Sequence, residues 1–315
     1  MNIVVLDGYT LNPGDISWEP LEKLGKLTVY DRTAPGQVVE RSLDVDILLT
    51  NKTVIGEEEI RLLPRLKYIG VLATGYNVVD VAAAKEAGIT VTNIPAYSTD
   101  SVAQQIFALI LTITNHAEYY SEQNRLGRWS RCEDFSYTDF PIMELAGKTM
   151  GIVGYGHIGK ATARIASAFG MKVRVFSSKP QTELPEVVKT ELDDLFRLSD
   201  VLCLCCPLAP DTKHMVNQRT LSLMKPTAIL INTGRGPLVD EQALATALNE
   251  GKLHAAGVDV LSSEPPAEDN PLLHCRNCYV TPHVAWESYE ARQRLMSIAA
   301  SNVSAFLSGN PVNIV

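Results

Sequence analysis

The sequence has no long run of apolar residues and no cluster of Lys and Arg. A membrane-spanning helix needs about 20 consecutive apolar residues, so none is expected here. The formal net charge of −8 disfavours nucleic-acid binding, which depends on neutralising phosphates with basic side chains. A small anionic substrate stays compatible with this charge, because a local pocket can be positive within an acidic protein. Internal repeats and low-complexity segments are lacking too, so no long disordered region is predicted.

Cysteine is scarce, with six among 315 residues. Cys203, Cys205 and Cys206 lie in an apolar run typical of a core strand, where a free thiol behaves as a small hydrophobe. Cys275 and Cys278 have metal or redox spacing, but one CxxC pair is only half of a usual zinc site. Packed free thiols and no bound metal are therefore predicted. The N-terminus also lacks the basic segment of a signal peptide, so a cytoplasmic protein with reduced cysteines is expected.

Short apolar runs alternate with amphipathic segments along most of the chain. This alternation predicts parallel sheets with helices on both faces, and the length of 315 residues suggests two domains. In the first half the predicted strands are Ile3–Leu6, Leu27–Tyr30, Ile47–Thr50, Tyr68–Val71 and Ile89–Thr92. In the second half they are Thr149–Val153, Lys172–Phe176, Val201–Cys205, Ala228–Asn232, Gly257–Val260 and Tyr279–Thr281.

Apolar residues at helical spacing predict the helices. One long helix is expected from Asp100 to Arg125, and a final helix from Tyr289 to Leu307. The segment Gly127–Leu145 is irregular and rich in aromatic residues, so it is predicted to be a loop that connects two domains. Further helices are predicted over Trp18–Leu24, Val79–Ala87, Ile158–Phe169 and Glu241–Asn249.

A glycine-rich turn over residues 154–159 follows an apolar strand and opens a helix. A lone GxGxxG pattern is weak, but between a strand and a helix it predicts a dinucleotide site rather than a turn without a ligand. Gly154 allows the tight turn, Gly156 lets the pyrophosphate approach the backbone, and Gly159 lets the helix pack on the strand. The helix N-terminus then presents unpaired N–H groups to the phosphates, so only the backbone of His157 is expected to matter.

The end of the next predicted strand bears on the choice of cofactor. NAD sites usually carry Asp or Glu there to hold the ribose 2′-OH, whereas this chain has Ser177, Ser178 and Lys179. Hydroxyl donors and a positive charge suit a 2′-phosphate, which favours NADP(H). NAD stays usable if these are ordinary polar residues at the end of a strand, so NAD(P) is the cofactor predicted.

Arg235, Glu264 and His283 each follow a different predicted strand of the second half. The carboxyl ends of parallel strands form the edge where such sheets bind ligands, which favours a catalytic set over three unrelated structural residues. Arg235 can bind a substrate carboxylate with two hydrogen bonds. His283 suits proton transfer near neutral pH, and a carboxylate such as Glu264 would orient its ring and favour the charged form. With a hydride from the cofactor, these residues predict interconversion of a small 2-keto acid and its 2-hydroxy acid.

The Gly154–Gly159 turn, the segment Asn232–Gly236, Glu264 and Thr281-Pro282-His283 together resemble the D-isomer-specific 2-hydroxyacid dehydrogenases over almost the whole chain. Within that family the resemblance is closest to glycerate dehydrogenases, also called hydroxypyruvate or glyoxylate reductases. Three further segments carry it. They are similar to the carboxylate-binding loop, the hinge and the linker of those enzymes, and they lie at 73–77, 97–104 and 129–137.

The resemblance implies an α/β fold with two doubly wound domains. A Rossmann nucleotide-binding domain over residues 100–286 would be inserted in a flavodoxin-like substrate domain formed by 1–99 and 287–315. It also implies a homodimer through the nucleotide domain. Catalytic roles fall on Arg235, Glu264 and His283, and substrate binding on Ala73, Thr74, Gly75 and Arg235. Asp259 would hold the nicotinamide amide, and the full set of expected cofactor contacts is Gly154, Tyr155, Gly156, His157, Ile158, Gly159, Ser177, Ser178, Lys179, Cys206, Pro207, Thr212, Thr233, Gly234, Arg235, Asp259 and His283.

Two positions depart from the family pattern. Ser177 replaces the usual acid, which puts strict use of NAD in doubt. Gln105 stands where relatives often carry histidine, with no consequence that the sequence reveals.

Two alternative functions on the same fold stay open. One is a 3-phosphoglycerate dehydrogenase, which often has an added regulatory domain. The other is a cofactor-sensing corepressor of the C-terminal-binding-protein type, which usually has extensions. A formate dehydrogenase typically has Gln in the place of Glu264 and is disfavoured.

Overall fold

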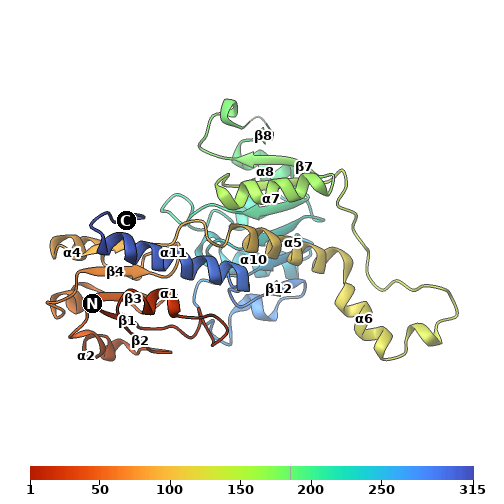
Figure 1. Ribbon diagram of the computed structural model, residues 1–315. Helices are drawn as coiled ribbons and strands as arrows, with labels where there is room; N and C mark the ends of the chain where they lie inside the picture. Colours follow the sequence, from red (N-terminus) through yellow and green to blue (C-terminus); the bar gives the residue numbers. More distant parts are fainter. Residues whose placement is uncertain (185) are drawn as a thin grey trace. The chain divides into compact units, whose positions relative to one another are not determined.

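The computed structural model describes residues 1–184 and 186–315, which form two compact units (Figure 1). The first unit comprises Met1–Ser98 and Trp286–Val315, and the second comprises Thr99–Ala285. The chain therefore leaves the first unit once and returns to it, so the second unit is an insertion in the first.

The first unit contains a five-stranded parallel sheet in the order β2-β1-β3-β4-β5. This is the flavodoxin-like order, in which the chain starts near the middle of the sheet and builds outward in both directions. The strands are β1 (Asn2–Val5), β2 (Lys26–Val29), β3 (Ile47–Thr50), β4 (Tyr68–Val71) and β5 (Thr90–Thr92). The helices are α1 (Glu19–Glu22), α2 (Val38–Ser42), α3 (Glu57–Arg61), α4 (Val81–Glu86) and α11 (Tyr289–Leu307).

Side chains alternate between the two faces of this sheet, and both faces are buried. Val4 and Leu48 point to the core shared with α2, α3 and α4, while Ile3 and Ile47 point to the core shared with α1 and α11. Helix α11 packs across β4, where the rings of Tyr68 and Phe306 lie 4.8 Å apart (Figure 1). Burial on both faces explains why the central strands β1, β3 and β4 are nearly continuous apolar runs in the sequence.

The second unit contains a seven-stranded parallel sheet in the order β12-β11-β10-β9-β6-β7-β8. Counted from its own first strand, this is the Rossmann order with one strand added beyond the sixth. The strands are β6 (Thr149–Val153), β7 (Lys172–Phe176), β8 (Val188–Lys189), β9 (Val201–Leu204), β10 (Ile229–Asn232), β11 (Ala255–Val258) and β12 (Cys278–Val280). The helices are α5 (Thr99–Asn115), α6 (Ala117–Arg125), α7 (His157–Ala168), α8 (Leu192–Leu198), α9 (Gln218–Leu221) and α10 (Glu241–Asn249).

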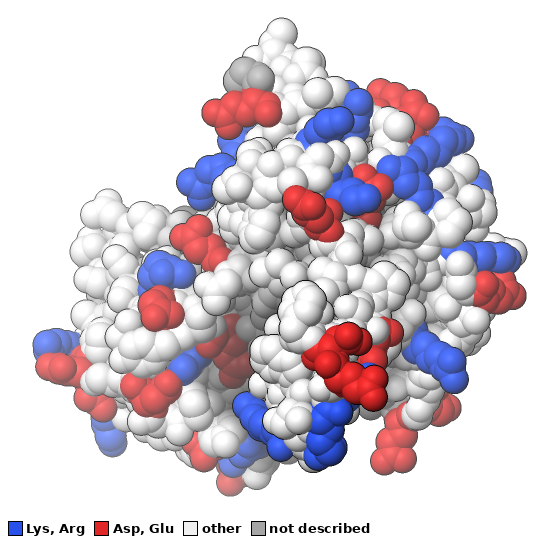
Figure 2. Space-filling view, turned by 90° about the vertical axis from the view of Figure 1, so that its right-hand side faces the viewer, with Lys and Arg blue, Asp and Glu red and all other residues white. Residues whose placement is uncertain are grey.

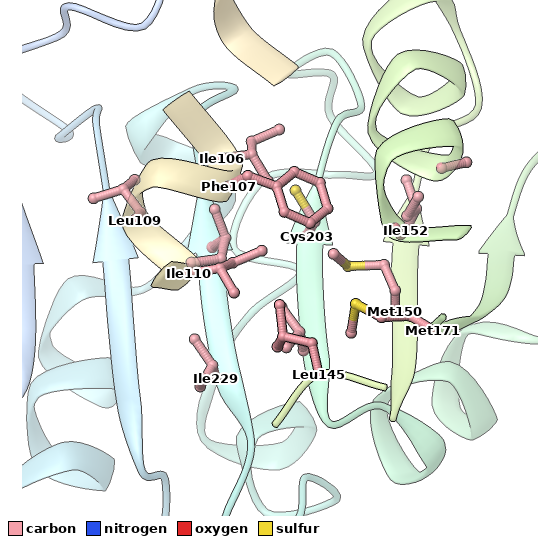
Figure 3. Close-up of a cluster of buried hydrophobic side chains, with 14 of the residues drawn as sticks. Ile106, Phe107, Leu109, Ile110, Leu145, Met150, Ile152, Met171, Cys203 and Ile229 are labelled. Atoms are coloured by element: carbon pink, nitrogen blue, oxygen red, sulfur yellow. The ribbon is translucent and has the colours of Figure 1, made fainter. Parts of the chain in front are cut away.

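Helix α5 covers one face of this second sheet. Its residues Ile106 and Ile110 are completely buried and belong to the same core as Met150, Cys203 and Ile229 of the strands (Figure 3). Helix α7 packs beside α5, and α8, α9 and α10 contribute to the core on the opposite face. The two-domain α/β class expected from the alternation of strands and helices is thus confirmed.

Two sequence predictions about residues 100–145 are wrong. The single helix over Asp100–Arg125 is two helices, because His116 adopts a left-handed conformation with φ 51° and ends α5. Helix α6 then buries none of its residues. The loop Gly127–Leu145 also lies within the second unit rather than between two domains. Its Tyr137 and Phe140 pack against the tyrosines of α6, so an aromatic-rich segment marks local packing here.

Strand boundaries differ most at β8 and β11. The two-residue edge strand β8 is too short to give an alternating pattern, and no strand was expected there. Strand β11 spans Ala255–Val258 instead of Gly257–Val260, because Ala255 and Ala256 supply buried pairing residues without the β-branched side chains typical of strands. Asp259 consequently follows the strand rather than lying inside it.

Charged side chains of both signs are mixed over the face in Figure 2, where no broad surface of one sign is visible. No helix within residues 1–184 and 186–315 is long and apolar enough to cross a membrane.

Candidate active site at the carboxyl ends of the second sheet

The turn between β6 and α7 has the geometry of a phosphate cradle. Gly154 has φ +92°, and a Cβ there would meet the backbone of Cys205 and Cys206 at 2.8 Å. A Cβ on Gly159 would lie 2.2 Å from the carbonyl oxygen of Gly154. A Cβ on Gly156 would meet no heavy atom within 4 Å. Two glycines are thus required by packing, while the third leaves open space at the start of α7, where a pyrophosphate fits the unpaired N–H groups.

The remaining residues of this turn can offer main-chain N–H groups to a ligand. His157 is the first residue of α7 and Ile158 follows it, so both present main-chain N–H groups at the helix start. The Tyr155 side chain is buried in the core under α5, which leaves only its main chain facing a ligand. The turn lies between β6 and β9, where the strand order of the sheet reverses and doubly wound sheets bind their ligands.

The turn after β7 contains Ser177, Ser178 and Lys179, and Lys189 of β8 reaches it. Ser177 is 9% exposed, and its hydroxyl accepts a hydrogen bond from the backbone N–H of Lys179 (3.2 Å). Ser178 and Lys179 are exposed. The Nζ of Lys189, on β8, donates to the carbonyl oxygen of Lys179 (2.9 Å). Lys189 therefore adds a second ammonium group to this turn, which sequence reasoning missed because β8 has no pattern of its own.

The loop after β9 is held by Thr212. Its hydroxyl donates to the carbonyl oxygen of Pro207 (2.9 Å) and accepts from the N–H of Ala209 (2.7 Å). Cys206 precedes this loop with its thiol 3.8 Å from the sulfur of Met215, and burial raises the pKa of Cys206 to about 11. A thiol in that state is a poor nucleophile, so Cys206 can contribute surface and main-chain groups to a cofactor site but not covalent chemistry.

Arg235 lies in a turn after β10 that Asn232 organises. The buried Asn232 side chain accepts from the N–H of Gly234 (3.1 Å) and donates to the carbonyl oxygen of Arg235 (2.9 Å). Thr233 is almost buried, whereas the Arg235 side chain is exposed and donates to the carbonyl oxygen of Gly234 (2.8 Å). The guanidinium group is therefore held over its own turn with further donors able to bind an anion.

Gly236 brings the Arg235 turn against the segment that carries Glu264. A Cβ on Gly236 would lie 2.0 Å from the carbonyl carbon of Leu261, so only glycine fits. The Glu264 carboxylate accepts from the N–H of Leu261 (3.1 Å) and thereby folds back over this contact. Strands β10 and β11 are neighbours in the sheet, and this close approach packs the loops that follow them against each other.

His283 and Glu264 are directly hydrogen-bonded. Nδ1 of His283 lies 2.6 Å from Oε2 of Glu264, with side-chain exposures of 25% and 37%. With Nδ1 engaged, Nε2 is the ring nitrogen left to exchange a proton with a ligand. The structure thus brings together the histidine and the carboxylate expected from the sequence. Arg235 follows β10, which is the neighbour of β11 in the same sheet.

The Asp259 carboxylate is surrounded by hydrogen-bond donors of the protein. It is 1% exposed, and its carboxylate accepts from the hydroxyl of Thr281 (2.5 Å) and the N–H groups of Val284 (3.0 Å) and Ala285 (2.9 Å). Burial raises the pKa of Asp259, and these donors partly offset that effect. Sequence reasoning missed Thr281 as a partner of this carboxylate, because the two residues lie 22 positions apart.

The predicted substrate loop lies in the first unit, after β4. The hydroxyl of Thr74 donates to the carbonyl oxygen of Ile94 (2.8 Å), and Asn93 donates to the carbonyl oxygen of Thr74 (2.8 Å). Ala73 is buried, and Gly75 is intermediate in exposure. These contacts fix the loop against the end of β5 within its own unit.

Cys275 and Cys278 are not part of a metal-binding cluster. Within the described residues, no group of three or more His, Cys, Asp or Glu side chains could hold a metal ion. Cys275 donates to the carbonyl oxygen of Pro271 (3.1 Å). Burial raises the pKa of Cys278 to about 12. Both therefore have the surroundings of packed, protonated thiols.

The sequence and the fold are similar to those of known proteins. Residues 107–285 match the model of the D-isomer specific 2-hydroxyacid dehydrogenase, NAD binding domain. The chain is 49% identical to hydroxypyruvate reductase of Blautia hydrogenotrophica over 100% of this chain and 99% of that protein. It is 44% identical to glycerate dehydrogenase of Methylorubrum extorquens over 91% and 90% of the two chains. Among solved structures, the acyclic imino acid reductase Bsp5 in complex with NADPH and D-Arg matches with a TM-score of 0.87 and 34% identity over 100% of both chains.

Proposed function

Because this chain belongs to the D-isomer specific 2-hydroxyacid dehydrogenase family, we propose that it interconverts hydroxypyruvate or glyoxylate with D-glycerate or glycolate. The observation that carries the proposal is the 2.6 Å contact between His283 Nδ1 and Glu264 Oε2, at the sheet edge that also bears Arg235. The names of the two relatives, hydroxypyruvate reductase and glycerate dehydrogenase, support the first of these pairs. We further infer that the nicotinamide cofactor is bound by the second unit.

Each catalytic residue has one task in the reduction of the keto acid. Arg235 binds the substrate carboxylate through its free guanidinium donors. His283 donates the Nε2 proton to the carbonyl oxygen as negative charge develops there. Glu264 holds the ring through Nδ1 and so orients Nε2 toward the substrate. In the direction of oxidation the neutral ring takes the proton from the hydroxyl group.

The glycine turn would hold the pyrophosphate of the cofactor and the turn after β7 its ribose. When bound, NAD(P)H supplies the hydride for the carbonyl carbon. Ser177, Lys179 and Lys189 favour NADPH, since two ammonium groups near a hydroxyl suit a 2′-phosphate. We assign the nucleotide-binding role to residues 100–286 and the substrate-domain role to 1–99 and 287–315. Binding of the substrate carboxylate by backbone N–H groups around Thr74 and Gly75 stays a prediction.

A panel of acids assayed with both cofactors tests this function. Hydroxypyruvate, glyoxylate, pyruvate and 3-phosphohydroxypyruvate are each offered with NADH and with NADPH, and cofactor consumption is recorded. Turnover is expected to be fastest with hydroxypyruvate or glyoxylate. Fastest turnover with the phosphorylated acid would support a 3-phosphoglycerate dehydrogenase instead. Tight cofactor binding without turnover of any acid would support a cofactor-sensing protein.

Replacing Arg235 by glutamine is expected to weaken use of the keto acid more than binding of the cofactor. A hydrogen bond to a charged group contributes about 1.5–3 kcal/mol, so kcat/KM for hydroxypyruvate falls by about 10–100-fold. The Kd for NADPH, measured by fluorescence titration, changes little. Arg219→Gln is the matched control, because Arg219 is an exposed arginine paired with Asp193 (2.8 Å). Equal losses in both measurements would mean that Arg235 is structural.

We also propose that the protein is a homodimer formed through the second unit. Helix α6 and the loop after it extend away from the sheet (Figure 1) and expose Leu126 (64%), Trp129 (54%) and Phe135 (92%). Apolar side chains this exposed are typical of a surface that a second copy covers.

The mass of the protein in solution tests this proposal. Analytical ultracentrifugation should give twice the chain mass of 34.5 kDa, and Phe135→Asp should weaken the dimer. Leu43→Asp, at an exposed leucine of the first unit, should not. A wild-type monomer contradicts the proposal.

A further inference from the structure

Gln105 is the departure from the family pattern that the sequence left without a role. It lies on α5, and its amide Nε2 donates to the hydroxyl oxygen of Thr281 (3.4 Å). Thr281 immediately precedes the Pro282-His283 segment at the end of β12. A polar side chain of the helix that covers the sheet therefore reaches the strand end that carries the catalytic histidine.

The Thr281 hydroxyl can connect Gln105 to Asp259 in only one direction. An ionised carboxylate only accepts hydrogen bonds, so the single hydroxyl proton of Thr281 points to Asp259 Oδ1 at 2.5 Å. The lone pairs of the same oxygen are then free to accept from the Gln105 amide. The result is an ordered chain of donors that runs from Gln105 through Thr281 to the carboxylate.

Asp259 in turn holds the backbone of His283 and of the two residues that follow it. Its main-chain carbonyl accepts from the N–H of His283 (2.8 Å). Its carboxylate accepts from the next two N–H groups, those of Val284 and Ala285. Because the carboxylate is 1% exposed, water cannot replace a donor that is lost, and each one matters for keeping the charge in place. Burial raises the pKa of Asp259, in keeping with this dependence on its donors.

His283 needs such support because its backbone is strained. Its φ is 55°, in the left-handed region that residues with side chains rarely adopt. Conformations of this kind persist only where the surroundings impose them, and they are often found at functional sites. In this conformation the His283 ring is hydrogen-bonded to Glu264. A change in the φ angle of His283 would therefore also move the ring.

We propose that Gln105 and Thr281 are positioning residues, which act through the Asp259 carboxylate to hold His283 in the conformation used for proton transfer. This inference rests on the proposed function of His283 and adds to it residues that do not touch the substrate. It also gives Asp259 an internal task in addition to the cofactor contact that the family resemblance implies.

Thr281→Val tests the chain by removing the hydroxyl at nearly constant volume. Misplacement of a catalytic group by a fraction of an ångström is costly, so kcat is expected to fall by about 10–100-fold while the KM for the keto acid and the Kd for NADPH change less than about threefold. Thr281→Ser restores the hydroxyl and should recover kcat to within about threefold of the wild type. The matched control is Thr114→Val, a buried threonine of α5 whose hydroxyl bonds to Asn115 (2.8 Å).

Gln105→Leu tests the hydrogen bond between Gln105 and Thr281. The bond at 3.4 Å is long and therefore weak, so a smaller loss of kcat, about 3–10-fold, is expected. Gln242→Leu, the same change at an exposed position of α10, is the control and should leave kcat within about twofold. In the double variant Gln105→Leu/Thr281→Val the two losses should not multiply, because residues of one network are not independent.

A measurement without turnover separates this inference from the proposed function. In 15N-histidine NMR spectra of the ligand-free protein, assigned with His283→Ala, the ring signals of His283 should shift or split in Thr281→Val and stay unchanged in Thr114→Val. An inactive wild type with this result contradicts the proposed function but supports the positioning role. Unchanged ring signals, no kcat loss beyond that of the control, failure of serine to rescue, or an equal loss of NADPH affinity each overturns the positioning role.

Discussion

Replacing His283 by alanine should lower kcat for hydroxypyruvate by about 10³-fold, within the range that general acid–base groups contribute. The reason is that Nδ1 of the ring is committed to Glu264, which leaves Nε2 as the proton donor to the carbonyl oxygen. Alanine retains the turn after β12 but supplies neither the proton nor the ring. Steady-state assays with saturating cofactor measure the loss, and fluorescence titration is expected to show NADPH binding within about threefold of the wild type.

The control for this variant is His274→Ala. His274 is exposed on the same unit and contacts only a backbone carbonyl in its own loop, that of Glu268 (2.7 Å), among the contacts described. Its removal should leave kcat unchanged. Added imidazole should restore part of the activity of His283→Ala and none of any loss in His274→Ala, because a free imidazole can fill the space of the missing ring. A kcat close to that of the wild type for His283→Ala would remove His283 from the mechanism.

The fold and the His283–Glu264 pair were accessible from the sequence for a shared physical reason. Buried parallel strands are continuous apolar runs, and polar residues placed directly after them must lie at one edge of the sheet. Glu264 and His283 follow neighbouring strands in this way, so local sequence was enough to bring them together. The glycine turn was accessible because its requirements are local: Gly154 has a left-handed φ, a Cβ on Gly159 would collide with Gly154, and Gly156 leaves space at the start of the helix.

The features that the sequence did not reveal depend on contacts between distant segments. Gln105 and Thr281 are 176 positions apart in the chain, and only the packing of α5 on the second sheet brings them within hydrogen-bond distance. Lys189 reaches the turn after β7 through a two-residue strand with no pattern of its own. The break at His116 is equally invisible, since helical spacing continues on both sides while the burial stops. Such features require the tertiary structure.

The largest change in cofactor selectivity is expected from Ser177→Asp. Ser177 lies almost buried at the end of β7, and its hydroxyl already accepts the N–H of Lys179, a bond that an aspartate can also accept. The new carboxylate would repel a 2′-phosphate and accept from a 2′-OH. Charged hydrogen bonds contribute about 1.5–3 kcal/mol and like-charge contacts cost several, so the ratio of kcat/KM for NADPH to that for NADH should fall by at least about 100-fold.

Ser177→Asn separates charge from size in this experiment. Asparagine has nearly the shape of aspartate and accepts the same backbone bond, but it carries no charge to repel a phosphate. Its cofactor ratio should therefore lie much closer to the wild type than to Ser177→Asp. Because Lys179 and Lys189 remain in both variants, the difference between them measures the effect of one negative charge at the ribose. An unchanged ratio in Ser177→Asp would mean that the cofactor ribose does not bind at this turn, and the preference for NADPH would have to arise elsewhere.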